Sequence, residues 1–196
     1  MDPEDPAGAV NPTRPQAFAL LSEHTANPNL IKHALCVEAA MRGYARRMGG
    51  DEEAWAIAGL LHDFDYEKHP TLDEHPFVGA EILRRLEYPP EIVEAILGHS
   101  DHTGVTRTTD MARALYAVDE LTGFIVACAL IRPSKSLHDL EVESITKKFK
   151  DKAFCRAIDR DHLRAAARQI EVPMDEHVGN VLEALQGIAG ELGLEG

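Results

Sequence analysis

The sequence predicts an all-α fold, a bundle of about six to nine helices. Apolar residues recur at the 3.6-residue spacing of an amphipathic helix through most of the 196 residues. Proline or an N-capping residue opens several of these stretches, and glycine or proline closes them. Aromatic residues make up only 6% of the chain, which is usual for a protein rich in helix.

The helical segments follow one another with short breaks. Pro15 lies in the first turn of the first segment, Gly49 and Gly50 end the second, and Asp51 is a suitable N-cap for the third. A long, strongly apolar segment stops before Pro133. The expected helices cover residues 15–27, 30–48, 51–63, 77–86, 91–99, 110–131, 142–149, 152–157, 160–170 and 174–192.

Length and composition indicate one domain. Hydrophobic residues make up 44% of the 196, enough for a sizeable core. Residues 1–14 are rich in proline, aspartate and alanine, and we expect a flexible N-terminal arm that lacks the features of a signal peptide. We expect a helical core over residues 15–135 that carries the functional site. C-terminal helices over residues 136–196 are expected to pack on this core within the same domain.

Charge and cysteine content narrow the function classes. A formal net charge of −13 repels nucleic-acid backbones and anionic membranes, which argues against duplex binding and membrane association. A small anionic substrate remains compatible, because bound metal ions reverse the local field. The three cysteines, Cys36, Cys128 and Cys155, are far apart and form no CxxC pair, which favours reduced thiols in a cytoplasmic protein.

Histidines and carboxylates at helix ends carry the chemical signal. His62 and Asp63 follow the apolar run Ala58 to Leu61, and imidazole and carboxylate are preferred ligands of divalent transition metals. A lone doublet of this kind more often just ends a helix. Asp119 is more informative, because it lies inside a strongly apolar helix. A buried carboxylate must be paired, protonated or bound to metal.

Three further histidines recur at comparable places. His33 shares a helix face with apolar residues, so it is either a core histidine or a ligand. His75 precedes the helix that Pro76 opens, at the predicted N-cap position. His99 ends a helix, where it would also complement the helix dipole.

The order of these residues closely resembles the HD-domain superfamily of metal-dependent phosphohydrolases. The family's marks are a first His, a His-Asp doublet that ends a helix, and a later Asp, with two more His in two-metal members. The resemblance covers about residues 30–132 and includes the local sequences AGLLHD, HPFVGAEIL, AILGH and AVD, which begin at residues 58, 75, 95 and 117. It implies an HD-type metal-binding core over residues 15–135.

One departure separates the chain from the common stand-alone subgroup. The chain resembles this HDIG-type subgroup in its six candidate ligands for a two-metal centre. The subgroup continues the doublet with Ile-Gly. Here Phe64 and Asp65 stand in those positions, and Asp65 would add negative charge near the metals.

The resemblance implies two divalent ions, drawn from Mn, Mg, Fe, Co, Ni and Zn. His33, His62, Asp63 and Asp119 would hold one ion, and Asp63 would bridge to a second ion held by His75 and His99. His102 is an alternative to His99. Asp63 and His102 are the proposed catalytic residues, whereas the candidates for substrate binding, each of which could equally be ordinary surface, are Lys68, His69, His102 and Arg107.

Three functions fit this pattern. The first is a phosphohydrolase that cleaves a phosphate ester of a small molecule, in particular a nucleotide, by means of a metal-activated water. The second is an HD-type di-iron oxygenase that cleaves a C–H bond, which uses the same ligand types. The third is a non-catalytic regulatory or binding module, against which the complete ligand set argues. The sequence is also compatible with a homodimer.

Overall fold

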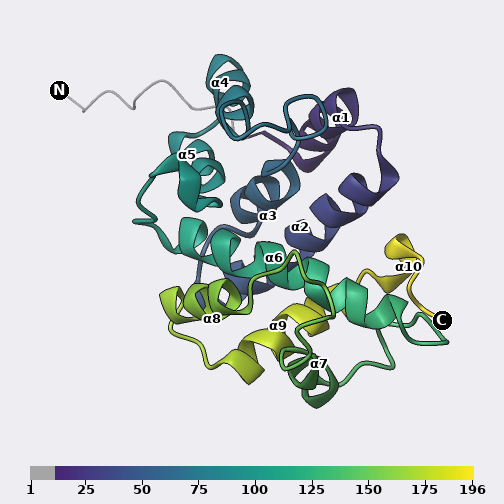
Figure 1. Cartoon of the computed structure of the whole chain (residues 1–196). Helices are drawn as coiled ribbons and strands as arrows, with labels where there is room; N and C mark the ends of the chain where they lie inside the picture. The colour runs from purple at the N-terminus through teal and green to yellow at the C-terminus, as the bar shows by residue number, and fades with distance from the viewer. Residues whose placement is uncertain (1–11) are drawn as a thin grey trace.

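The computed structural model describes residues 12–196, and over that range the chain is all-α, as predicted (Figure 1). The described residues form ten α-helices and one 3-10 helix, and contain no strand. The helices are α1 (Arg14–His24), α2 (Pro28–Met48), α3 (Glu52–Leu61), α4 (Phe77–Arg85), α5 (Pro90–Gly98), η1 (Asp101–Thr103), α6 (Asp110–Leu130), α7 (Val142–Lys148), α8 (Arg160–Gln169), α9 (Met174–Gln186) and α10 (Ala189–Leu192).

The expected N-terminal arm falls largely outside the described residues, because residues 1–11 are not described. Its last two residues belong to the start of α1. Thr13 is the N-cap, forming a capping box with Gln16, and Arg14 is the first helical residue. The Arg14 guanidinium also forms an ion pair with Glu38 of α2, in which the two closest atoms are 2.6 Å apart.

Two expected helices differ from the structure. No helix forms over residues 152–157, because the Asp151 carboxylate accepts hydrogen bonds from two following backbone amides and Arg160 donates to the carbonyl groups of Phe154 and Cys155. These side chains satisfy the backbone in a turn. The final helix is divided into α9 and α10 at Gly187.

Helix α3 lies at the centre of the fold. All of its residues from Trp55 to Leu61 are buried, and it packs against α1, α2, α5 and α6. Gly59 permits the closest approach to α2, because a Cβ atom there would lie 2.9 Å from the Val37 carbonyl oxygen. The end of α3 therefore sits directly against the first half of α2.

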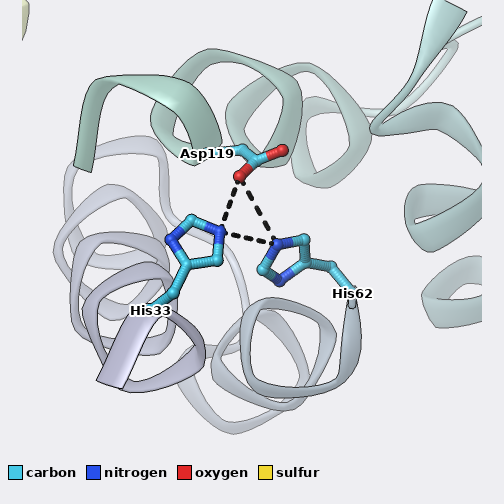
Figure 2. Close-up of side chains that lie close together, drawn as sticks. All are labelled: His33, His62 and Asp119. Atoms are coloured by element: carbon cyan, nitrogen blue, oxygen red, sulfur yellow. Dashed lines mark hydrogen bonds and ion pairs between the residues drawn. The ribbon is translucent and has the colours of Figure 1, made fainter. Parts of the chain in front are cut away.

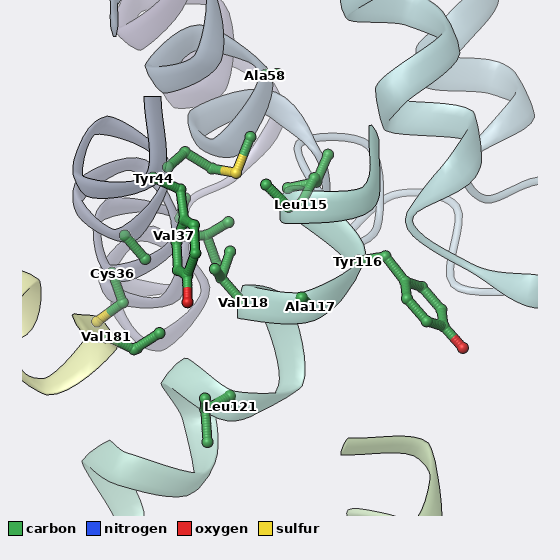
Figure 3. Packing of buried hydrophobic residues seen from close by; sticks show 14 of the residues in the cluster. Cys36, Val37, Tyr44, Ala58, Leu115, Tyr116, Ala117, Val118, Leu121 and Val181 are labelled. Atoms are coloured by element: carbon green, nitrogen blue, oxygen red, sulfur yellow. The ribbon is translucent and has the colours of Figure 1, made fainter. Parts of the chain in front are cut away.

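The C-terminal helices pack on the other side of α2 and α6. Helix α9 contacts both, and Figure 3 shows side chains of α2, α6 and α9 in one apolar cluster. Within this cluster the fully buried His177 ring lies between the Tyr44 hydroxyl, 2.5 Å from Nδ1, and the Ala117 carbonyl oxygen, 3.0 Å from Nε2. None of the helices described here has the length and apolar character needed to cross a membrane.

The hydrogen bonds of His177 suit the neutral ring. Nδ1 accepts from the tyrosine hydroxyl and Nε2–H donates to the carbonyl, so a second ring proton would have no acceptor. Burial lowers the pKa of His177 from 6.5 to about 4, although the hydrogen bond to Ala117 opposes this shift. The unfolded chain therefore binds one more proton between these two pH values, and the folded state loses stability as the pH falls through them.

Between pH 7 and pH 4 we expect the unfolding free energy of the wild type to fall by about 3 kcal/mol more than that of His177→Gln. The value follows from the pKa shift of His177 at about 1.36 kcal/mol per pKa unit. Glutamine can donate and accept hydrogen bonds but carries no titrating group. Urea denaturation of metal-free protein at several pH values measures the difference. Parallel pH profiles for the two proteins would contradict this assignment.

Candidate metal centre

Five helices bring the six sequence-predicted metal ligands to one place. His33 comes from α2, Asp119 from α6, and His62 is the C-cap of α3, with Asp63 in the turn that follows. The other two flank neighbouring helices: His75 precedes α4, whose N-cap is Pro76 rather than His75, and His99 is the C-cap of α5. Together they form two groups of three whose ligand atoms lie within 4.8 Å of one another.

The first group consists of His33, His62 and Asp119 (Figure 2). Oδ1 of Asp119 lies 3.0 Å from Nε2 of His33 and 3.4 Å from Nε2 of His62. The two imidazole Nε2 atoms are 3.2 Å apart. The side chain of His62 is fully buried, whereas those of His33 and Asp119 are 24% and 17% exposed, so this group is reachable from solvent.

The second group consists of Asp63, His75 and His99. Oδ1 of Asp63 lies 3.2 Å from Nε2 of His75 and 3.4 Å from Nε2 of His99. The other carboxylate oxygen, Oδ2, lies 3.4 Å from Nε2 of His62 in the first group. Asp63 therefore stands between the two groups and turns one oxygen toward each.

Hydrogen bonds on the far side of each ring fix three of the histidines. Nδ1 of His62 contacts the Gly59 carbonyl oxygen, Nδ1 of His99 contacts the Ile96 carbonyl oxygen, and Nδ1 of His75 contacts the Asp65 carboxylate. Because carbonyl and carboxylate oxygens only accept, each Nδ1 carries the proton. In the neutral rings all three Nε2 lone pairs then point at the lone pairs of carboxylates and of one another.

Hydrogen-bond acceptors this close together repel one another unless a positive charge lies between them. In the metal-free protein protons supply it. Burial lowers the pKa of His62, but the Asp63 and Asp119 carboxylates outweigh this effect and hold the pKa well above its usual value. For His75, burial is likewise outweighed by hydrogen bonds to Asp63 and Asp65, and its pKa rises to about 9.

The donor set also fits divalent metal ions. Imidazole nitrogen and carboxylate oxygen bind ions such as zinc at about 2.0–2.2 Å, so ligand atoms about 90–110° apart around one ion are about 3.0–3.5 Å from each other. The separations of 3.0, 3.2 and 3.4 Å within the first group fall in this range. Each group supplies two nitrogens and one oxygen with no thiolate, which suits the metals expected from the sequence.

Asp65 contacts the second group, although it is not among the site residues that the sequence predicts. Its side chain is 1% exposed, and its two oxygens lie 2.8 Å from Nδ1 of His75 and 2.7 Å from the Gly79 backbone nitrogen. Gly79 makes room for it, because a Cβ atom there would lie 2.8 Å from the Asp65 Cγ. The one signal in the sequence was a carboxylate in the position where the HDIG pattern has glycine.

The other predicted site residues lie outside the two groups. His102 is exposed, with Nε2 2.9 Å from the His75 carbonyl oxygen and Nδ1 2.8 Å from the Ser100 hydroxyl. Lys68 donates to the Glu23 carbonyl and His69 lies 3.3 Å from Glu74. The roles of these three residues in catalysis or substrate binding stay predictions.

Arg107 is engaged in structural contacts. Its guanidinium donates to Gln169, to the Gly98 carbonyl and to Asp101, and lies 3.6 Å from the centre of the Tyr116 ring. These contacts tie the loop after α5 to α6 and α8. Substrate binding by Arg107 stays a prediction.

Known proteins provide an independent comparison. The model of the HD domain family matches residues 30–123, the segment that supplies all six residues of the two groups. Ribonuclease Y of Sulfurovum sp. is 40% identical over 77 residues, which cover 38% of this chain and 15% of the relative. Ribonuclease Y of Lactobacillus acidophilus is 29% identical over 115 residues, which cover 58% of this chain and 21% of the relative.

Longer coverage comes with lower identity. Ribonuclease Y of Lawsonia intracellularis is 28% identical over 149 residues, which cover 75% of this chain and 27% of the relative. The chain thus spans only about a quarter or less of the length of these relatives. No solved structure matched the chain. The helical fold, the family match and the order of the histidines and aspartates together show that residues 30–123 of this chain form an HD domain.

Proposed function

We propose that this protein is a phosphohydrolase that uses two divalent metal ions to cleave a phosphate ester. The observation that carries the proposal is the position of Asp63, with Oδ1 facing His75 and His99 and Oδ2 facing His62. A carboxylate shared in this way is the expected link between two metal ions that act on one phosphoryl group.

The protein's own residues would hold and orient the ions. His33, His62 and Asp119 would bind one ion, His75 and His99 the other, and Asp63 would contribute one oxygen to each. Two bound ions would polarise the phosphoryl group and lower the pKa of a coordinated water. Attack of the water oxygen on phosphorus would break the bond to the ester oxygen. The water would release its proton to solvent, and the departing oxygen would take a proton, for which His102 is the proposed donor.

Within the phosphate esters we propose a nucleotide or a related small molecule as the substrate. The relatives named ribonuclease Y support this choice, because the name describes cleavage of a nucleotide phosphodiester in those proteins. The formal charge of −13 disfavours long nucleic acids as substrates of this chain.

The metal content of purified variants tests the assignment of Asp63. We expect Asp63→Ala to lose both ions and His75→Ala to lose mainly the second, because only Asp63 faces both groups. Elemental analysis by mass spectrometry, with circular dichroism to verify folding, measures the number of ions per chain. His102→Ala should keep the wild-type content, and a full complement in Asp63→Ala would refute the shared-ligand role.

Asp65 should act on the second ion through His75. We expect Asp65→Ala to lower the affinity for that ion by about 10- to 100-fold, the usual effect of removing the hydrogen-bond partner of a metal-binding histidine. A metal titration monitored by calorimetry measures the affinity of each of the two sites. Asp73→Ala removes an exposed carboxylate from the same loop and should bind both ions as the wild type does. An unchanged second site in Asp65→Ala would show that His75 needs no such partner.

Hydrolysis of bis(p-nitrophenyl) phosphate and of a panel of nucleotides and short RNA oligonucleotides tests the reaction itself. We expect metal-dependent release of product that chelation abolishes and Asp63→Ala reduces by more than about 100-fold, since both ions are lost. Two irons per chain with oxygen consumption and no hydrolysis would instead favour the oxygenase. Stable binding of nucleotides without turnover would favour the regulatory module.

A further inference from the structure

An apolar cavity of about 370 Å³ lies beside the first group of the metal centre. It is formed between α2, α6 and the C-terminal segment after α9, and His33 lines it. The same His33 ring contacts Asp119 at 3.0 Å, so one imidazole belongs both to the metal centre and to the cavity wall. The cavity size lies within the range of small-molecule pockets in proteins.

Apart from Asn29, Lys32 and His33, the residues that line the cavity are apolar or lack a strongly polar side chain. Cys36, Val126, Leu192 and Leu194 supply much of the lining, and burial raises the pKa of the Cys36 thiol to about 12, so this wall is neutral. The three polar lining residues follow one another closely in α2, and two of them, Asn29 and Lys32, are exposed. These walls suit an apolar ring or alkyl chain better than a strongly polar group.

Gly123 leaves part of the cavity empty that a larger side chain would fill. It lies one helical turn after Asp119 in α6, and a Cβ atom there would meet no heavy atom within 4 Å. Glycine inside a helix is less stable than alanine, because its backbone loses more conformational freedom on folding. The chain therefore keeps a less stable residue where a larger side chain would extend into the cavity.

The C-terminal segment is held in place as the outer wall. Lys32 donates to the Leu192 carbonyl oxygen at 2.7 Å, and the Leu137 backbone amide donates to the Leu194 carbonyl at 2.8 Å. Leu192 and Leu194 are 1% and 7% exposed, although they lie near the end of the chain. The cavity is thus a built pocket with a fixed wall.

We propose that this cavity binds the apolar organic group of the substrate, a ring or a short alkyl chain, while the attached phosphate lies at the metal centre. The proposal rests on the phosphate-ester function, not on the choice of a nucleotide, and extends that function to esters of an apolar organic group. Two neighbouring residues of the centre support it, because His33 lines the cavity and Asp119 precedes Gly123 by one turn of α6.

Phosphonates test the proposal without hydrolysis, because their carbon–phosphorus bond is not an ester. In Mn²⁺-loaded wild type we expect phenylphosphonate to bind at least about tenfold more tightly than methylphosphonate by calorimetry, as burial of the ring predicts. Gly123→Leu and Val126→Phe fill the cavity and should reduce this preference to within about twofold. Methylphosphonate should bind both variants as it binds the wild type.

Gly123→Ala is the matched control, because it adds one carbon at the same position and leaves most of the cavity open. It should keep the wild-type preference for phenylphosphonate. A second measurement needs neither metal nor phosphate: toluene added to metal-free protein should shift the methyl NMR signals of Val126, Leu192 and Leu194. These shifts should be absent in Gly123→Leu.

The outcomes separate this proposal from the function on which it rests. Equal affinities of the two phosphonates for the wild type, or no response of these methyl groups to toluene, would overturn the cavity as the site of the apolar group. If toluene shifts the methyl signals but neither phosphonate binds, the phosphate-ester function fails and with it the substrate role of the cavity. Tight phenylphosphonate binding that the filling variants abolish would support both.

Discussion

The convergence of acceptor atoms on Asp63 is the constraint on which the site depends. The imidazole nitrogens of four histidines and the oxygens of two carboxylates come within 3.0–3.4 Å of one another, and without a cation or added protons these contacts are repulsive. The fold must hold them there. It does so by anchoring the opposite edge of the rings, through the carbonyl groups of Gly59 and Ile96 and through the carboxylate of Asp65.

The anchoring depends in turn on how closely the helices approach. Helix α3 is buried along nearly its whole length and Gly59 lets it touch the backbone of α2, so that the ring of His62 reaches that of His33. Gly79 plays the corresponding part at the second group, where it makes room for Asp65 and donates to it. Both glycines therefore allow the close contacts that bring the ligands together, because a side chain at either position would collide with its neighbour.

Most of the fold and the six central residues could be predicted from the sequence. Apolar periodicity and capping residues located the helices that surround the site, and the order of His33, the doublet, His75, His99 and Asp119 resembled a known family. The prediction was weakest where side chains compete with helix formation. At residues 152–157 Asp151 and Arg160 bind the backbone of a turn, a contact that helical periodicity does not reveal.

The sequence by itself determined the helical class, the family and the identity of the candidate ligands, because these follow from local periodicity and from the order of residues along the chain. Only the tertiary structure decided which oxygen of Asp63 faces which histidines, and that Asp65 holds His75. It also decided that a cavity opens between His33, Gly123 and the C-terminal leucines. The physical reason is that these features join segments as far apart as residues 33 and 194, and their relative positions are set by packing between helices.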